Sequence, residues 1–306
     1  MKRDGRISLR AKSVRLGLSW FVKRRTRHET LEQSRRRLLV MEAVIPHPPR
    51  GTETITINVG GVSADQVITP ASRPNRHVLY LHGGGYRLGA PSTYRHLTWR
   101  IASAAQAQVL VIDYRLAPEN PFPAALEDAV SYYCWLLAEG ADARQIVVIG
   151  DSAGGGLALA LLLKLRDSSL PRPAAAVVLS PWTDLALTGA SLTLNAKLDA
   201  IVEAEDAPIF AADYLAGTDP RHPYASPLYG DPTGLPPTLI QVGSEEVLRD
   251  DAVRMAEKMQ RAHCQAELQI WPRMPHVWHF LAPILPEARE AIAEISKFVQ
   301  RTVTTE

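Results

Sequence analysis

The sequence predicts an α/β protein with a mostly parallel central sheet and helices on both faces. The main observation is a rhythm that starts at His77, where short apolar stretches such as HVLYLH, QVLVIDY and QIVVIG alternate with longer stretches of helical character. Strands that are apolar throughout are typical of parallel sheets that helices cover on both faces. With 306 residues, of which 46% are hydrophobic, the chain can bury a large core as one domain with an elaboration or as two domains.

The expected elements follow in chain order. Thr30, with Gln33 three residues later, indicates the start of a helix over 31–44. An antiparallel strand pair is expected at 54–59 and 64–69. Later strands are expected at 77–82, 108–114, 145–150, 174–180, 238–243 and 266–271, and later helices at 94–105, 125–140, 156–167, 250–263 and 287–300. Between Trp182 and Pro236 the rhythm is interrupted, which predicts an insertion above the sheet.

Residues 150–154 read GDSAG and fit the pattern G-x-S-x-G between an expected strand and an expected helix. In lipases and esterases this pattern marks a sharp turn that presents a nucleophilic serine, and neighbouring backbone comes too close there for residues larger than glycine at its ends. The pattern is common by chance, so a glycine-rich turn with an idle serine is the alternative. Its position between strand and helix favours Ser152 as a nucleophile.

Three consecutive glycines, Gly83 to Gly85, follow the strand expected at 77–82. A serine hydrolase needs backbone N–H groups directed at the oxygen that becomes negative during attack, and glycines let the chain approach the substrate closely. We therefore expect Gly83, Gly84 and the N–H of Ala153 to form an oxyanion hole. The loop could instead serve only to turn the chain, but two motifs in the order typical of esterases argue against that.

Four motifs, LHGGGY, DYRLAPENPFPAALEDA, GDSAGG and SPWTDL, together resemble the hormone-sensitive-lipase-like branch of the α/β-hydrolases, which consists mainly of bacterial carboxylesterases. The likeness runs from about His77 to the C-terminus. It implies the α/β-hydrolase fold with a helical cap. The segments it implies are an N-terminal helical cap segment at 1–50, a first part of the hydrolase core at 51–184, a cap insertion at 185–225 and a second part of the core at 226–306.

The resemblance also implies the other two members of a catalytic triad. In PRMPHVWHFLAP, the family's pattern of Met, one residue, His and a following aromatic falls on His276 as the general base. His279 stands in the same stretch and stays open as an alternative base. In SEEVLRDD, the family's spacing to a later Leu and an acidic pair assigns the acid to Glu246, where the family usually has Asp. Glu245 is the alternative acid.

Further side chains are expected around the site. Tyr86, Asp151, Trp278 and His279 are candidates for the substrate pocket. His82 is expected to orient the glycine loop rather than act as a base, since the order of the triad puts its histidine last.

The tract DYRLAPENPFPAALED is a structural brace more often than a chemical group in this family. Asp113, Arg115 and Glu119 are therefore expected to form a buried or partly buried polar network that supports the glycine loop.

These residues predict a serine carboxylesterase that hydrolyses small, short-acyl esters through a Ser-His-Glu triad and an acyl-enzyme intermediate. The short-acyl expectation comes from the family, in which a capped pocket favours soluble esters. Lactone, thioester or amide hydrolysis by the same triad and a non-catalytic ligand receptor on this fold stay open as alternatives. No metal or cofactor is expected, because the H-x-x-H of HVWH lacks a ligand spacing and no phosphate-binding signature is present.

The charge of the chain is uneven. Residues 1–50 carry 14 Lys and Arg against 4 Asp and Glu, whereas the remainder carries 20 against 28. This asymmetry indicates a basic helical segment that docks on an acidic body, with attachment to a membrane surface as the lesser alternative. Nucleic-acid binding is not expected, because no reader motif accompanies the basic residues.

Location and assembly follow from weaker signals. The sequence contains no apolar run that could span a membrane and no pattern of a secretory signal, so a cytoplasmic location is expected. Cys134 and Cys264 are not spaced as a pair, which fits a reducing compartment. Family members often dimerise through edge strands, and the apolar strand at 266–271 is expected to join a second copy in a homodimer.

Overall fold

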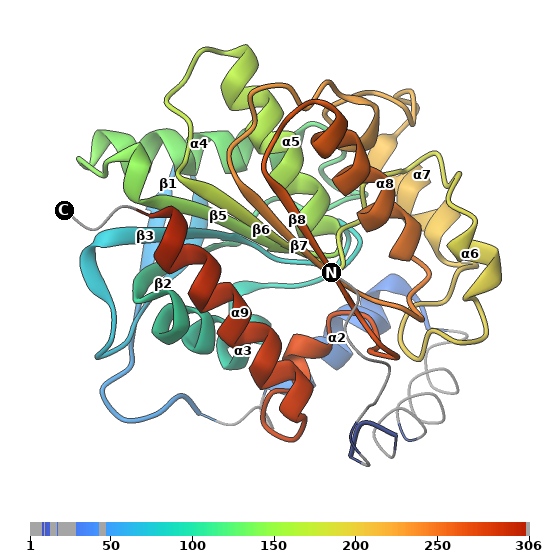
Figure 1. Ribbon diagram of the computed structural model, residues 1–306, viewed down its shortest axis with the longest axis horizontal. Helices are drawn as coiled ribbons and strands as arrows, with labels where there is room; N and C mark the ends of the chain where they lie inside the picture. The colour runs from blue at the N-terminus through green and yellow to red at the C-terminus, as the bar shows by residue number, and fades with distance from the viewer. Residues whose placement is uncertain (1–7, 9, 13–16, 18–28, 43–46, 304–306) are drawn as a thin grey trace.

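The computed structural model describes residues 8, 10–12, 17, 29–42 and 47–303. Within these ranges the chain forms one twisted eight-stranded sheet with helices packed on both of its faces (Figure 1). This architecture confirms the fold class that the apolar strand pattern predicts.

The sheet is mostly parallel. Its strands lie in the order β1-β2-β4-β3-β5-β6-β7-β8, and the six from β4 to β8 in that order run parallel to one another. β1 pairs antiparallel with β2, as the sequence predicts, and β2 pairs antiparallel with β4. The strands are β1 (Glu53–Val59), β2 (Val62–Ile68), β3 (Arg73–Leu81), β4 (Ala107–Ile112), β5 (Ile146–Asp151), β6 (Ala175–Leu179), β7 (Thr238–Gly243) and β8 (Ala266–Trp271).

Helices cover the sheet in two layers (Figure 1). Apolar residues of β5 alternate between the layers: Val148 packs with the side of α4, α5 and α8, whereas Val147 and Ile149 pack with the side of α3 and α9. The helices are α2 (Leu31–Glu42), α3 (Pro91–Ala105), α4 (Ala124–Ala138), α5 (Ala153–Asp167), α6 (Ser191–Leu194), α7 (Ala207–Leu215), α8 (Arg249–Arg261) and α9 (Pro286–Thr302), with short 3₁₀ turns η1 (Ala143–Gln145), η2 (Pro227–Tyr229) and η3 (Trp278–Leu281).

The start of α2 confirms the predicted helix signal. Thr30 Oγ1 accepts a hydrogen bond from the Gln33 N–H at 3.3 Å, and Gln33 Oε1 accepts one from the Thr30 N–H at 2.9 Å. These two bonds pair N–H groups that a helix start would otherwise leave without partners. The last two residues of the helix expected over 31–44 lie outside the described residues.

An insertion interrupts the strand and helix rhythm between β6 and β7, as predicted. This segment, residues 180–237, contains α6, α7 and η2 and no strand. Its helix α7 packs on the loop after β3, because the ring of Tyr214 stacks on the ring of Tyr86 with centroids 3.7 Å apart. Asp213 also pairs with Arg87 of that loop at 2.7 Å. The insertion therefore lies against the loop that carries the three glycines.

Candidate active site

The turn between β5 and α5 holds Ser152 in a strained conformation. Its φ of 53° and ψ of −122° lie outside the regions that side chains other than glycine normally adopt. The flanking glycines make this turn possible. A Cβ on Gly150 would lie 2.1 Å from the Gly154 carbonyl oxygen, and a Cβ on Gly154 would lie 2.0 Å from the Leu81 carbonyl oxygen. The turn thus leaves Ser152 half-buried at the carboxyl end of the central strand.

The amino end of α5 lies directly behind Ser152. The Ser152 carbonyl accepts the N–H groups of Gly155 at 3.0 Å and Gly156 at 3.1 Å. Ala153 is the first residue of α5, so its N–H has no partner within the helix. The N–H of Ala153 is therefore available to an oxygen atom bound next to Ser152.

The glycine loop presents a different set of N–H groups from the expected set. The Gly83 N–H donates to Asp151 Oδ1 at 3.1 Å, inside the protein. Among the described residues, the N–H groups of Gly84 and Gly85 make no hydrogen bond. The Gly83 N–H is therefore already bonded inside the protein, and the N–H groups of Gly84 and Gly85 are the ones that this loop leaves open to a bound oxygen atom.

Asp151 is a buried support of that loop rather than a pocket residue. Besides the Gly83 N–H, its carboxylate accepts the Tyr80 hydroxyl at 2.7 Å and the Tyr94 hydroxyl at 3.3 Å. Burial raises the pKa of Asp151 to about 6, although these bonds act in the opposite direction. The side chain next to the nucleophile thus ties the turn after β5 to the loop after β3.

His276 and Glu246 form a buried pair at the same edge of the sheet. Glu246 follows β7 and His276 follows β8, and Glu246 Oε2 lies 2.9 Å from His276 Nδ1. Burial alone would lower the pKa of His276, but the hydrogen bond and charge of Glu246 outweigh it, so the pKa is raised. Glu245 lies 3.9 Å from Arg273 instead. The structure therefore joins His276 to the carboxylate that the family spacing indicates.

Ser180 supports this pair and was not predicted. Its hydroxyl donates to Glu246 Oε1 at 2.8 Å and accepts the Val277 N–H at 3.1 Å. Ser180 follows β6 directly, between the strands that carry Ser152 and Glu246. Its place in SPWTDL, at the carboxyl end of a buried strand, was the available signal.

The pair lies within electrostatic reach of the nucleophile turn. The carboxylate of Asp151, the neighbour of Ser152, contributes to the raised pKa of His276. Ser152 Oγ makes no hydrogen bond to any residue that the structure describes. Nucleophile and base contacts are often loose in structures without substrate.

Three other candidate pocket residues are not at the surface. Tyr86 is 1% exposed because Tyr214 covers its ring, and Trp278 and His279 are 0% exposed. His279 Nε2 lies 2.8 Å from Gln241 Oε1, and burial lowers the pKa of its imidazole to about 3. The structure places these three side chains in the protein interior, where Trp278 packs in the core on the side of α3 and α9. The contacts of His279 also argue against it as the base.

The expected network of Asp113, Arg115 and Glu119 does not exist as such. All three residues are exposed, and each bonds a different partner: Ser63, Asp128 and Arg35, respectively. The support for the glycine loop comes instead from Tyr114, a buried residue that stands between Asp113 and Arg115 in the sequence. Its hydroxyl donates to the His82 carbonyl at 2.7 Å, and its ring stacks on the His82 ring at 4.2 Å.

His82 itself fits the expectation that it orients the loop. Its Nδ1 lies 2.8 Å from the Gly83 carbonyl oxygen, and burial lowers the pKa of the imidazole to about 4.

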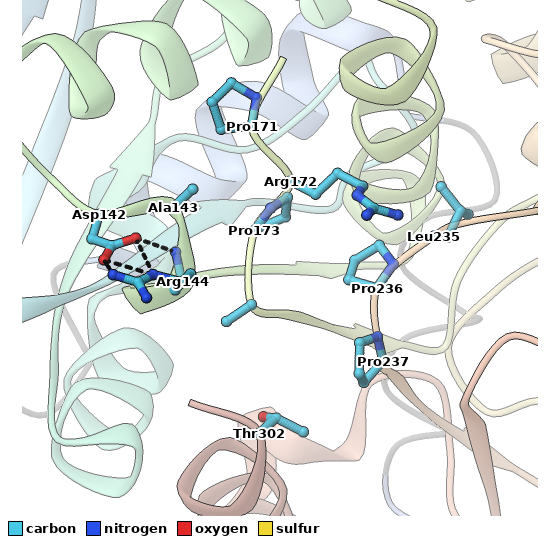
Figure 2. Close-up of a pocket in the computed structure, with 11 residues that line it drawn as sticks. Asp142, Ala143, Arg144, Pro171, Arg172, Pro173, Leu235, Pro236, Pro237 and Thr302 are labelled. Carbon is cyan, nitrogen blue, oxygen red and sulfur yellow. Dashed lines mark hydrogen bonds and ion pairs between the residues drawn. The ribbon is translucent and has the colours of Figure 1, made fainter. Parts of the chain in front are cut away.

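An open hollow of about 650 Å³ lies at the other end of the sheet (Figure 2). Apart from Thr302 at the end of α9, its lining residues precede strands β5, β6 and β7 and so lie at their amino ends, whereas Ser152, Glu246 and His276 follow the carboxyl ends. The lining includes Asp142, Arg144, Pro171, Arg172, Pro173, Leu235, Pro236, Pro237 and Thr302. This hollow is separate from the candidate site.

Known proteins resemble this chain over most of its length. A family model described as alpha/beta hydrolase fold matches residues 78–280. An acetyl-hydrolase of Streptomyces hygroscopicus is 50% identical over 250 residues, which cover 82% of this chain and 83% of that protein. An esterase of Acinetobacter venetianus is 37% identical over 243 residues, covering 79% and 80%. A crystal structure of an esterase from the bacterial hormone-sensitive lipase family matches with 44% identity and a TM-score of 0.92, covering 97% of this chain and 99% of that chain.

Fold and site together define an α/β-hydrolase. Within that class, the chain belongs to the hormone-sensitive-lipase-like family of bacterial carboxylesterases, and it is an ester hydrolase. No helix in the part of the chain that the structure describes is long and apolar enough to cross a membrane.

Proposed function

We propose that this enzyme hydrolyses small carboxylic esters through a Ser152-His276-Glu246 triad and an acyl-enzyme. The observation that carries the proposal is the 2.9 Å contact between Glu246 Oε2 and His276 Nδ1. A carboxylate at Nδ1 keeps the proton on that nitrogen, and Nε2 is then free to accept the serine proton.

In the first half of the reaction, Ser152 Oγ attacks the ester carbonyl carbon while His276 Nε2 takes its proton. The carbonyl oxygen becomes negative, and the N–H groups of Gly84, Gly85 and Ala153 stabilise that charge. The alcohol then leaves with the proton from His276, and the acyl group stays on Ser152. In the second half, water attacks the acyl carbon while His276 takes a proton from it. His276 then returns a proton to Ser152 Oγ as the carboxylic acid leaves.

Glu246 is one methylene longer than the Asp that the family usually has, and its surroundings support it in the role of acid. The carboxylate is 0% exposed, and Oε1 is held by the Ser180 hydroxyl at 2.8 Å and by the Gly243 N–H at 2.5 Å. Both bonds leave Oε2 for His276. A carboxylate held in this way stabilises the imidazolium that forms during attack without leaving its place.

A cap made of residues 185–225 and of the segment 1–50 would restrict the substrate to small acyl groups. In support, the ring of Phe210 on α7 lies so close to Gly85 that a Cβ there would be 2.1 Å from it. Helix α2 also contacts this loop, because Arg35 Nε donates to the Arg87 carbonyl at 3.0 Å. Both α7 and α2 therefore contact the glycine loop. The relative from Streptomyces hygroscopicus is an acetyl-hydrolase by name.

The substrate class is tested with p-nitrophenyl esters of increasing acyl length, using Ser152→Ala as the matched control. We expect the highest kcat/KM on acetate and butyrate esters and a loss of at least about 10³-fold in Ser152→Ala. A higher rate on emulsified triglyceride than on short esters would overturn the substrate class. Lactones, thioesters and amides measured beside the esters test the alternative reactions of the same triad.

A homodimer through β8 is a further part of the proposal. β8 is the last strand in the sheet order, so one of its edges has no neighbouring strand within the described residues. Unpaired edges favour association. Light scattering at micromolar concentration should give twice the chain mass, and a monomer there would contradict the dimer.

A further inference from the structure

Three short polar side chains of the insertion are buried at a spacing of four residues. They are Ser191, Asn195 and Asp199, which are 0%, 5% and 1% exposed. Buried polar side chains need partners, because an unpaired one costs free energy on burial. All three find them in residues 244–250, which comprise the turn between β7 and α8 and the first two residues of α8. We call this segment the acid turn because it contains Glu246.

Each of the three side chains bonds the backbone of the acid turn. Ser191 Oγ donates to the Val247 carbonyl at 2.6 Å and accepts the Asp250 N–H at 3.0 Å. Asn195 Nδ2 donates to the Glu246 carbonyl at 2.8 Å and, at 3.3 Å, to the carbonyl of the first residue of the turn.

Asp199 completes this set, because its carboxylate bonds both the acid turn and the backbone of the insertion itself. Its Oδ2 accepts the Val247 N–H at 2.9 Å, while its Oδ1 accepts the N–H groups of Ile201 at 2.9 Å and Val202 at 3.0 Å. One buried carboxylate thus ties the acid turn to the insertion. Without the insertion, the turn would keep backbone groups that have no partner inside the fold, and it would lose this conformation.

Asp199 also acts on His276 through its charge. Three carboxylates face His276: Glu246 from the acid turn, Asp151 from β5 and Asp199 from the insertion. Each favours the protonated imidazole. The imidazole of His279 lies within electrostatic reach of His276, and burial lowers its own pKa to about 3.

We propose that Ser191, Asn195 and Asp199 form a clamp that positions the triad acid, with Asp199 as its charged positioning residue. This proposal rests on the proposed function, since it gives Glu246 and His276 their triad roles. The same insertion contacts the glycine loop through Tyr214 and Asp213. The insertion thereby fixes the positions of Glu246 and the glycine loop relative to each other. It therefore contributes to kcat and not only to substrate access.

The test compares Asp199→Asn with a matched control, Asp184→Asn. Both residues are 1% exposed aspartates of the insertion, but Asp184 bonds Thr188, Tyr229 and Arg254 rather than the acid turn. In Asp199→Asn, removal of the negative charge lowers the pKa of His276, so the acidic limb of kcat/KM moves to lower pH. We also expect kcat on p-nitrophenyl acetate to fall about tenfold or more with KM changed less than about threefold. Asp184→Asn should lower the melting temperature without moving the limb.

A second variant keeps the test decisive if Asp199→Asn does not fold. Asn195→Ala removes the donor to the Glu246 carbonyl without changing any charge, so it should lower kcat and leave the acidic limb in place. An unchanged kcat in Asn195→Ala, or an unchanged limb in a folded Asp199→Asn, would overturn the clamp. Failure of the proposed function would look different, because Ser152→Ala would then keep its activity whatever the clamp variants do.

Discussion

Glu246 and His276 lie 2.9 Å apart, from Oε2 to Nδ1, and the carboxylate is 0% exposed. The charge of a buried carboxylate is not screened by solvent, so it acts strongly on the one imidazole it contacts. Ser180 and Gly243 hold the other carboxylate oxygen, which fixes the direction of the pair. This relationship makes the two ring nitrogens of His276 unequal, as a general base requires.

Substitutions at Glu246 and Glu245 should show which of the two carboxylates is the triad acid. Glu246→Gln should keep the fold but lower kcat by several orders of magnitude, up to about 10⁴-fold by analogy with the aspartate of the serine protease triad, because the wrong tautomer of His276 is then favoured. Glu245→Gln should cost little. Steady-state kinetics of both variants on one ester check this, and the reverse order of effects would assign the acid to Glu245.

The acidic limb of the pH profile should report His276. The base must be neutral to accept a proton, and the pKa of His276 is raised above the usual 6.5. As the pH falls through that raised value the imidazole becomes charged, so kcat/KM should decrease with it. Profiles of kcat/KM from pH 5 to 9, measured where the enzyme stays folded, should show this limb; a flat profile would count against His276 as the base.

A methyl group at Gly154 should disrupt the nucleophile turn. Gly154→Ala places a Cβ 2.0 Å from the Leu81 carbonyl oxygen, which cannot move without breaking the end of β3. We expect the free energy of unfolding to fall by about 3 kcal/mol or more. Gly60→Ala is the control, because φ is +60° there but no atom lies within 4 Å, and left-handed strain alone costs about 1 kcal/mol. Urea unfolding of both variants measures the difference, and equal losses would contradict the steric account.

Ionisation of the buried carboxyl of Asp251 should lower the free energy of unfolding as the pH rises. Its side chain is 1% exposed, and burial raises the pKa of the carboxyl from 3.8 to about 7. Between these values the folded protein holds a proton that the unfolded chain has released, so the free energy of unfolding falls as the pH increases through that window.

Asp251→Asn should reduce this fall, since an amide has no proton to lose and its oxygen can still accept the N–H groups of Thr183 and Asp184. Melting temperatures at pH 5 and pH 8 measure it. Asp219→Asn, on the exposed surface of the insertion, should behave like the wild type. An Asp251→Asn profile as steep as that of the wild type would show that another group is responsible.

Much of the fold could be predicted because its signal is local. The segments 145–150 and 174–180 each contain a continuous apolar run, and the structure confirms strands at both. The two glycine motifs could be placed as well, because each directly follows a stretch with the pattern of a strand. Glu246 could be found by its spacing to Leu248, although its residue type departs from the family.

The rest depended on contacts that no local pattern contains. Whether the Gly83 N–H points inward depends on Asp151, which lies on another strand. The sequence does not show which of the neighbours Asp113 and Tyr114 is buried. In the structure Tyr114 is buried and Asp113 is exposed. Ser180 bonds a partner 66 residues away in the chain, so only the sheet order brings the two together.

The central claim is that Ser152 carries the acyl group during turnover, and the covalent intermediate tests it most directly. The enzyme is mixed with p-nitrophenyl acetate, quenched in acid within the first turnovers and digested, and the peptides are analysed by mass spectrometry. The account predicts an acetyl group on the peptide that contains Ser152, and none on the corresponding peptide of Ser152→Ala. Turnover of the ester by Ser152→Ala at the wild-type rate, or an acetyl group on another residue that turns over at the rate of catalysis, would contradict it.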